Sequence, residues 1–152
     1  MLEVLIAAAL AIVLGVVGFI YLGGRRGTVE VQSSARQITA VLRDAQQRAL
    51  SNASSTSWGV RFTNATATQP FYALFASSTY STSSVVEYHS LPLRIAYASS
   101  SLASGASRDI VFTQGTGETA TSSTIVVQLS SNASSSYTIS VSSIGRVTYT
   151  SP

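Results

Sequence analysis

Apolar residues fill nearly every position from Met1 to Leu22. As a helix rising about 1.5 Å per residue, this stretch reaches roughly 33 Å, enough to cross the hydrocarbon core of a bilayer. Glu3 is the single charged residue before Arg25. The pattern therefore predicts an apolar helix over residues 1–24 that lies in a membrane or in another apolar environment.

A narrower apolar stripe continues through residues 25–52. Its members recur at spacings of four and three residues: Val31, Ala35, Ile38, Leu42, Ala45 and Ala49, with Val41 beside them. This spacing predicts an amphipathic helix that packs one face on the rest of the molecule. Thr28 stands where an N-cap would start a separate helix, and Asp44 and Arg48 are spaced for an i,i+4 ion pair. The helical pattern ends at Ser51–Asn52.

Residues 53–152 change to short alternating runs rich in Val, Ile, Tyr, Phe and Thr, separated by Ser, Gly and Asn. Such runs predict strands. We expect them near 57–62, 71–77, 85–90, 93–98, 109–113, 123–129, 136–142 and 146–150. A loop over Ser130–Ser136 and a turn with positive φ at Gly145 join the last three strands as hairpins. The expected fold class is α+β, a long N-terminal helix packed on an antiparallel sheet that forms a β-rich head.

The composition favours a head that faces outward. Only 10% of residues are charged, the net charge is +3, and Ser and Thr dominate the polar set. Hydroxyl-based solubility is unusual for a cytoplasmic surface. All basic residues are scattered Arg, so no specific nucleic-acid partner is predicted. The absence of cysteine excludes disulfides and thiolate metal sites.

The orientation of the head poses a conflict. Arg25 and Arg26 directly follow the apolar stretch, and the positive-inside rule would then place the head in the cytoplasm. A short basic leader, removed after it has set the orientation, would resolve this conflict. A cleaved secretory signal is the alternative. Such signals require a basic segment before the apolar stretch, and here no Lys or Arg precedes it.

Glu3 allows two interpretations. A carboxylate near the end of an apolar helix costs a few kcal/mol in lipid unless a partner neutralises it. The N-terminal ammonium group of a neighbouring subunit would be such a partner. Alternatively, Glu3 lies at the bilayer interface and is hydrated.

Glu3 and the run VLIAAALAIVL over residues 4–14 resemble the N-terminal signature of mature type IV pilins and type II secretion pseudopilins. In that family the Glu is the fifth residue, which implies about two residues before Met1. The resemblance further implies that Glu3 neutralises the terminal amine of an adjacent copy while the helix passes from the inner membrane into a filament core. It also implies a prepilin peptidase and assembly machinery as partners.

The run LRDAQQRA over residues 42–49, followed by a β-rich domain, resembles the H-type minor pseudopilins. We therefore expect a structural subunit of an extracellular type IV pilus-like filament for adhesion, motility or uptake, membrane-anchored before assembly. A minor pseudopilin of a type II secretion system is one alternative, and a membrane-anchored binding domain that never polymerises is another. The chain lacks the late Pro of the apolar segment and the C-terminal cysteine pair of many major pilins.

Four glycines occur in or just after the apolar stretch: Gly15, Gly18, Gly23 and Gly24. Each weakens a helix by up to about 1 kcal/mol relative to Ala. They predict that the helix can be interrupted near residues 15–27, above all inside a filament.

Chemistry-bearing residues are few. His89 shares a strand face with Glu87, but no nucleophile-elbow spacing surrounds it or Asp109, and the carboxylates form no metal-ligand pattern. We expect no enzyme activity, metal or cofactor, and we expect the glycine-rich run 115–118 to be a turn. Glycosylation sequons begin at Asn52, Asn64 and Asn132, each in an expected loop, although a chain so rich in Ser and Thr also produces sequons by chance.

Overall fold

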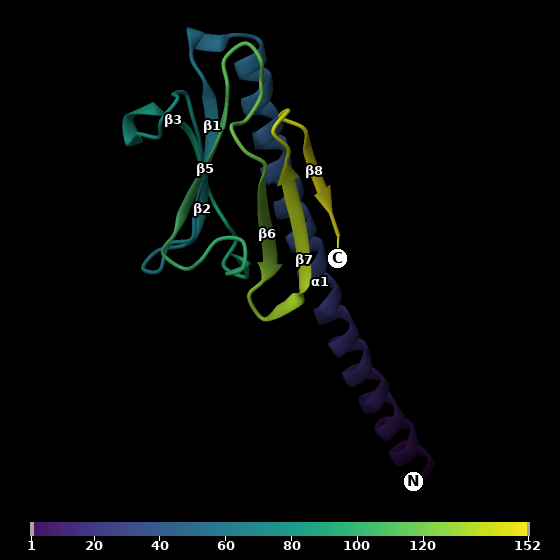
Figure 1. Cartoon of the computed structure of the whole chain (residues 1–152). Coiled ribbons are helices and arrows are strands. Elements are labelled where there is room, and N and C mark those ends of the chain that lie inside the picture. Colours follow the sequence, from purple (N-terminus) through teal and green to yellow (C-terminus); the bar gives the residue numbers. More distant parts are fainter. Residues whose placement is uncertain (1, 152) are drawn as a thin grey trace.

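A computed structural model describes residues 2–151 of the chain, and for residues 2, 5 and 16–26 it describes the backbone alone. The helix α1 (Leu2–Leu50) is one continuous element of 49 residues. Figure 1 shows that its N-terminal half projects from the head, whereas its C-terminal half lies along the sheets. The short 3-10 turns η1 (Ala53–Ser55) and η2 (Thr82–Ser84) lie in the head.

Eight strands follow α1, and every strand predicted from the alternation is confirmed within a few residues. They are β1 (Trp58–Thr63), β2 (Phe71–Phe75), β3 (Val85–Ser90), β4 (Ile95–Tyr97), β5 (Ser107–Phe112), β6 (Ser123–Leu129), β7 (Asn132–Val141) and β8 (Val147–Thr150). The α+β class is confirmed. The strands form two antiparallel sheets, β3-β2-β1-β5 and β4-β6-β7-β8, where we expected one. Alternation defines the strands, but pairing between distant strands decides the sheets.

The apolar stripe of α1 forms one side of the core, as predicted. All six of its members are fully buried, and Val41 is packed beside them. The inner faces of both sheets supply the other side, with Val60, Phe62 and Ile110 from the first and Ile125, Val127 and Ile139 from the second. The two sheets and the second half of the helix thus share a single core.

Two local expectations need correction, one at Thr28 and one at the start of the seventh strand. Thr28 caps no separate helix, because α1 runs through it without a break. The helix is also continuous through residues 15–27 in this single chain, and its interruption inside a filament stays a prediction. The strand expected from 136 starts at Asn132, because a shift in register between Gln128 and Leu129 lets the pairing resume close to the turn.

The end of α1 is capped by the residue that follows it and by a loop from the far part of the chain. The N–H of Ser51 donates to the carbonyl of Gln47 (2.9 Å), and the N–H of Gly115 donates to that of Ala49 (2.8 Å). The run 115–118 is a turn, as predicted, with φ of +79° at Gly115. The β7–β8 turn is confirmed too, with φ of +81° at Gly145.

Candidate assembly surface

The projecting half of α1 presents apolar side chains to solvent in every direction. Each described side chain from Glu3 to Gly15 is exposed. Val4 and Leu14 are each 71% exposed, near the two ends of this segment. A helix that is apolar on all sides is stable in a folded protein only where lipid or another protein covers it. We call this segment, residues 3–15, the assembly surface.

The residues described with their side chains cover only part of the predicted membrane span. Among the residues described with their side chains, no helical stretch combines the length and the apolarity of a membrane span. The span predicted over 1–24 includes residues 16–24, whose side chains lie outside the described ones. The same is true of Arg25 and Arg26, on which the orientation argument rests.

Glu3 lies in the first turn of α1 and is exposed. At this position the partial positive charge of the helix N-terminus stabilises a carboxylate. The structure of one chain places no neighbouring subunit beside it, so the pairing of Glu3 with a terminal amine remains a prediction.

The glycines of α1 have different surroundings. A Cβ at Gly15 would meet no atom within 4 Å, and Gly18, Gly23 and Gly24 lie outside the fully described residues. Sequence reasoning missed Gly27, which is buried and where a Cβ would lie 2.9 Å from Leu129 Cδ2. Gly27 therefore lets α1 pass close to the end of β6 at the point where the helix leaves the head. The signal was present, because Gly27 precedes Val31 by four residues, the period of the stripe.

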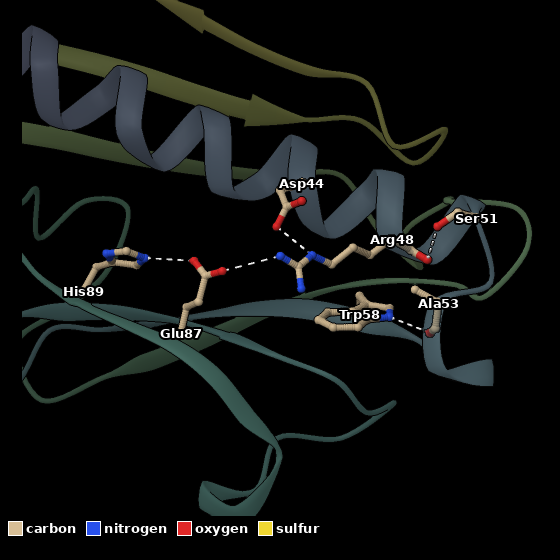
Figure 2. A network of polar contacts seen from close by, with 7 residues as sticks. All are labelled: Asp44, Arg48, Ser51, Ala53, Trp58, Glu87 and His89. Carbon is tan, nitrogen blue, oxygen red and sulfur yellow. Dashed lines mark hydrogen bonds and ion pairs between the residues drawn. The ribbon is translucent and has the colours of Figure 1, made fainter.

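A chain of polar contacts fastens the other end of α1 to the first sheet (Figure 2). Arg48 Nε donates to Asp44 (2.8 Å), which confirms the predicted pair, and Arg48 Nη2 reaches Glu87 (3.4 Å). The guanidinium also lies 4.8 Å from the centre of the Trp58 ring. These side chains are a third or more exposed, so each ion pair contributes about 1 kcal/mol or less. The contacts fix the direction of the helix relative to β1 and β3.

His89 lies on the same face of β3 as Glu87, as the alternation predicted, and its Nε2 is 3.3 Å from the Glu87 carboxylate. Its ring stacks on Tyr72 at a centroid distance of 5.0 Å. Within the described part of the chain, no three His, Cys, Asp or Glu side chains gather in a way that would hold a metal ion. His89 thus has a packing partner in Tyr72 and an acidic neighbour in Glu87.

Two tyrosines on different strands are packed in the core. Tyr97 of β4 donates its hydroxyl to the Phe71 carbonyl of β2 (3.1 Å) and so joins the two sheets. Burial raises the pKa of Tyr97 far above 10.0, with a smaller contribution from Tyr72, and burial also raises the pKa of Tyr72. By contrast, Tyr88 is 59% exposed.

Partial burial raises the pKa of Asp109, and Arg61 beside it opposes this shift. The Arg61 guanidinium lies 3.5 Å from the Asp109 carboxylate and stacks on the Tyr80 ring at 4.1 Å. Arg61 and Asp109 lie on the outer face of the first sheet.

The three sequons have different environments. Asn52 is exposed at the end of α1 in a left-handed conformation, and its side-chain oxygen accepts from Gln114. The amide of Asn64 donates to the Leu102 carbonyl (2.9 Å), which ties it to a neighbouring loop. Asn132 is exposed but starts β7, whereas we expected it in a loop. Glycan attachment at these positions remains a prediction.

The arrangement defines a class of fold. A helix with a buried second half and an exposed apolar first half, followed by an antiparallel β head, is pilin-like. Two crystal structures of the type IV minor pilin FimU from Pseudomonas aeruginosa strain PAO1 have this fold. One aligns with a TM-score of 0.60 over 80% of this chain and 88% of its own length, at 17% identity. The other gives 0.57 over 78% and 91%, at 16% identity. The chain therefore has the fold of a type IV pilin.

No protein-family model matches the sequence, and no curated protein matches it. Because the sequence identity to FimU is low, the similarity shows a shared fold and nothing more.

Proposed function

We propose that this chain is a pilin-like subunit that is anchored in the inner membrane by α1 and then polymerises into an extracellular filament. The observation that carries the proposal is the assembly surface, residues 3–15, on a chain with the pilin fold. The head buries its own apolar core, so the surface that needs a partner is the projecting helix.

The energetics favour two successive environments for this helix. Removing apolar surface from water is favourable by about 25 cal/mol per Å². Lipid covers the assembly surface before polymerisation, and the helices of other copies cover it in the filament. A prepilin peptidase and an assembly machinery would act on the chain between these states.

Glu3 makes this transfer specific. In an apolar filament core, an unpaired carboxylate is costly, whereas the terminal amine of a neighbouring copy neutralises it. The carboxylate therefore sets the axial position of one helix against the next, in addition to the non-directional apolar contact.

The test is Glu3→Ala in cells that produce the protein, with Glu30→Gln as the matched control on the same helix. Glu30 contacts Arg94 within the subunit (4.0 Å) and should tolerate the change. We expect Glu3→Ala to abolish filaments in the sheared surface fraction, as seen by immunoblot and electron microscopy, while the membrane fraction keeps the subunit. Normal filaments with Glu3→Ala would overturn the role of Glu3, whereas a subunit that stays in the membrane fraction and forms no filaments even with Glu3 intact would indicate a plain membrane anchor.

A minor-subunit role is the second candidate. The likeness to a minor pilin and the H-type run over 42–49 support it, in a pilus or in the pseudopilus of a type II secretion system. Immunogold labelling of native filaments distinguishes the roles. Label along the whole length indicates a major subunit, and label confined to filament ends indicates a minor one.

A further inference from the structure

The turn between β3 and β4 carries the most exposed large apolar side chain among the described residues. Leu93 is 88% exposed, next to Arg94, whose side chain is 56% exposed. The N–H of Ile95 donates to the Pro92 carbonyl (2.9 Å), which closes the turn. The segment Pro92–Arg94 is thus a tight, ordered turn with an apolar apex beside a cation.

This turn lies at the end of the head from which α1 projects. Arg94 Nη1 is 4.0 Å from the Glu30 carboxylate of α1. The Arg94 carbonyl accepts from the N–H of Ser130 (2.8 Å), in the β6–β7 turn. That turn is at the base of the head in Figure 1, where the helix emerges. Leu93 therefore lies at the base of the head, beside the point where α1 emerges.

The rise of the helix per residue sets the distance between the apolar stretch and the base of the head. The apolar stretch ends at Leu22, and Gly27, the first residue after it whose surroundings are described, lies against the head about 7.5 Å further along the axis. The headgroup layer on each side of a bilayer is also several ångströms thick. If the apolar stretch spans the bilayer, the base of the head lies at the headgroup layer.

We propose that the turn Pro92–Arg94 docks on the lipid surface while the subunit is anchored, with Leu93 at the boundary of the acyl chains and Arg94 at the phosphate oxygens. The inference rests on the membrane stage of the proposed function. A lone apolar apex beside a guanidinium fits a lipid interface, which accepts both groups, better than a flat protein interface, which needs a broader patch. Glu30 is the carboxylate that competes for Arg94.

Site-specific labelling can test this docking, because the chain contains no cysteine. The full-length variants Leu93→Cys, Val13→Cys and Ile144→Cys are each labelled with an environment-sensitive fluorophore. They are reconstituted in vesicles of phosphatidylcholine and phosphatidylglycerol that contain nitroxide-bearing lipid. Ile144 is the matched control, an apolar turn residue that is 68% exposed at the other end of the head, where Gly145 meets Gly117.

We expect nitroxide lipid to quench the label at 93 several-fold more than the label at 144, with a blue-shifted emission at 93. The label at 13 reports on the anchor itself. Quenching at 13 with equal, weak quenching at 93 and 144 would overturn the docking and leave the anchor intact. A label at 13 that stays unquenched, together with an unquenched 93, would contradict the membrane stage as well.

Discussion

At the scale of single residues, Gly145 shows how closely the head is packed at the end of α1. Its φ of +81° belongs to the left-handed region that glycine adopts without strain. A Cβ at this position would also collide with the carbonyl oxygen of Gly117 and the amide of Gln46. The sequence predicted the positive φ from the hairpin pattern, but the collision depends on a loop almost thirty residues away in the chain.

We predict that Gly145→Ala destabilises the protein more than Gly115→Ala does. Both positions have φ near +80°, so both variants incur about 1–2 kcal/mol of backbone strain. A Cβ at Gly115 would meet no atom within 4 Å, so only Gly145→Ala adds a steric clash, worth about 1–3 kcal/mol. Thermal unfolding of the full chain in detergent, followed by circular dichroism, measures the difference. Equal melting temperatures would contradict the packing described here.

A second prediction concerns alkaline pH. The fold raises the pKa values of Tyr97 and Tyr72 above 10.0, so the native state binds more protons than the unfolded state at high pH. The two protonated tyrosines contribute their full stabilisation of the native state below pH 10, and this contribution is lost as the pH rises further. The free energy of unfolding should fall above pH 10 by up to about 1.4 kcal/mol per pH unit for each tyrosine.

Tyr97→Phe provides the check. It removes one titrating group together with the hydrogen bond to the Phe71 carbonyl. Denaturant titrations from pH 8 to 11.5 should show a lower stability at pH 8 but a shallower decline above pH 10. An unchanged slope would mean that Tyr97 is not the group responsible.

At the scale of elements, α1 combines two kinds of helix in one continuous rod. The described side chains of residues 3–15 are all exposed, whereas from Val31 onward one stripe is buried and the opposite face is polar. The change of pattern was visible in the sequence, since the first part is apolar at nearly every position and the second only at spacings of three and four. The continuity was not, because Thr28 and the glycines are equally compatible with a break.

We predict that Leu42→Ala costs about 2–5 kcal/mol of stability, since Leu42 is fully buried between α1 and the sheets. Leu50→Ala is the control, because Leu50 is 50% exposed and should lose about half as much or less. Leu and Ala have similar helix propensities, so the change in propensity is small and the same in both variants. Urea denaturation of the two variants in detergent decides the matter, and similar losses for both would place Leu42 outside the core.

At the scale of the whole molecule, the chain consists of a self-contained head and an apolar extension. The second half of α1 supplies one side of the core, so the head needs α1 only from Gly27 onward. The first half makes the protein dependent on lipid or on other copies. This division agrees with the proposed function, in which the projecting helix exchanges one apolar environment for another.

We predict that a fragment of residues 27–152 folds as a soluble monomer, whereas the full chain needs detergent to stay dispersed. Light scattering coupled to size-exclusion chromatography gives the mass, and circular dichroism compares the fold. The fragment should keep the cooperative unfolding of the head. An unfolded or aggregated fragment would show that the projecting half of α1 also stabilises the head.

The sequence by itself determined the elements and the main feature of the site: the helical stripe, the eight strands, the apolar segment and the position of Glu3. These follow from local periodicity and from the cost of apolar surface in water. The tertiary structure alone decided the division into two sheets, the bridge from Arg48 to Glu87, the contact of Gly27 with Leu129 and the place of Leu93 at the base. Each joins residues far apart in the chain, and local periodicity carries no information about which distant partners meet.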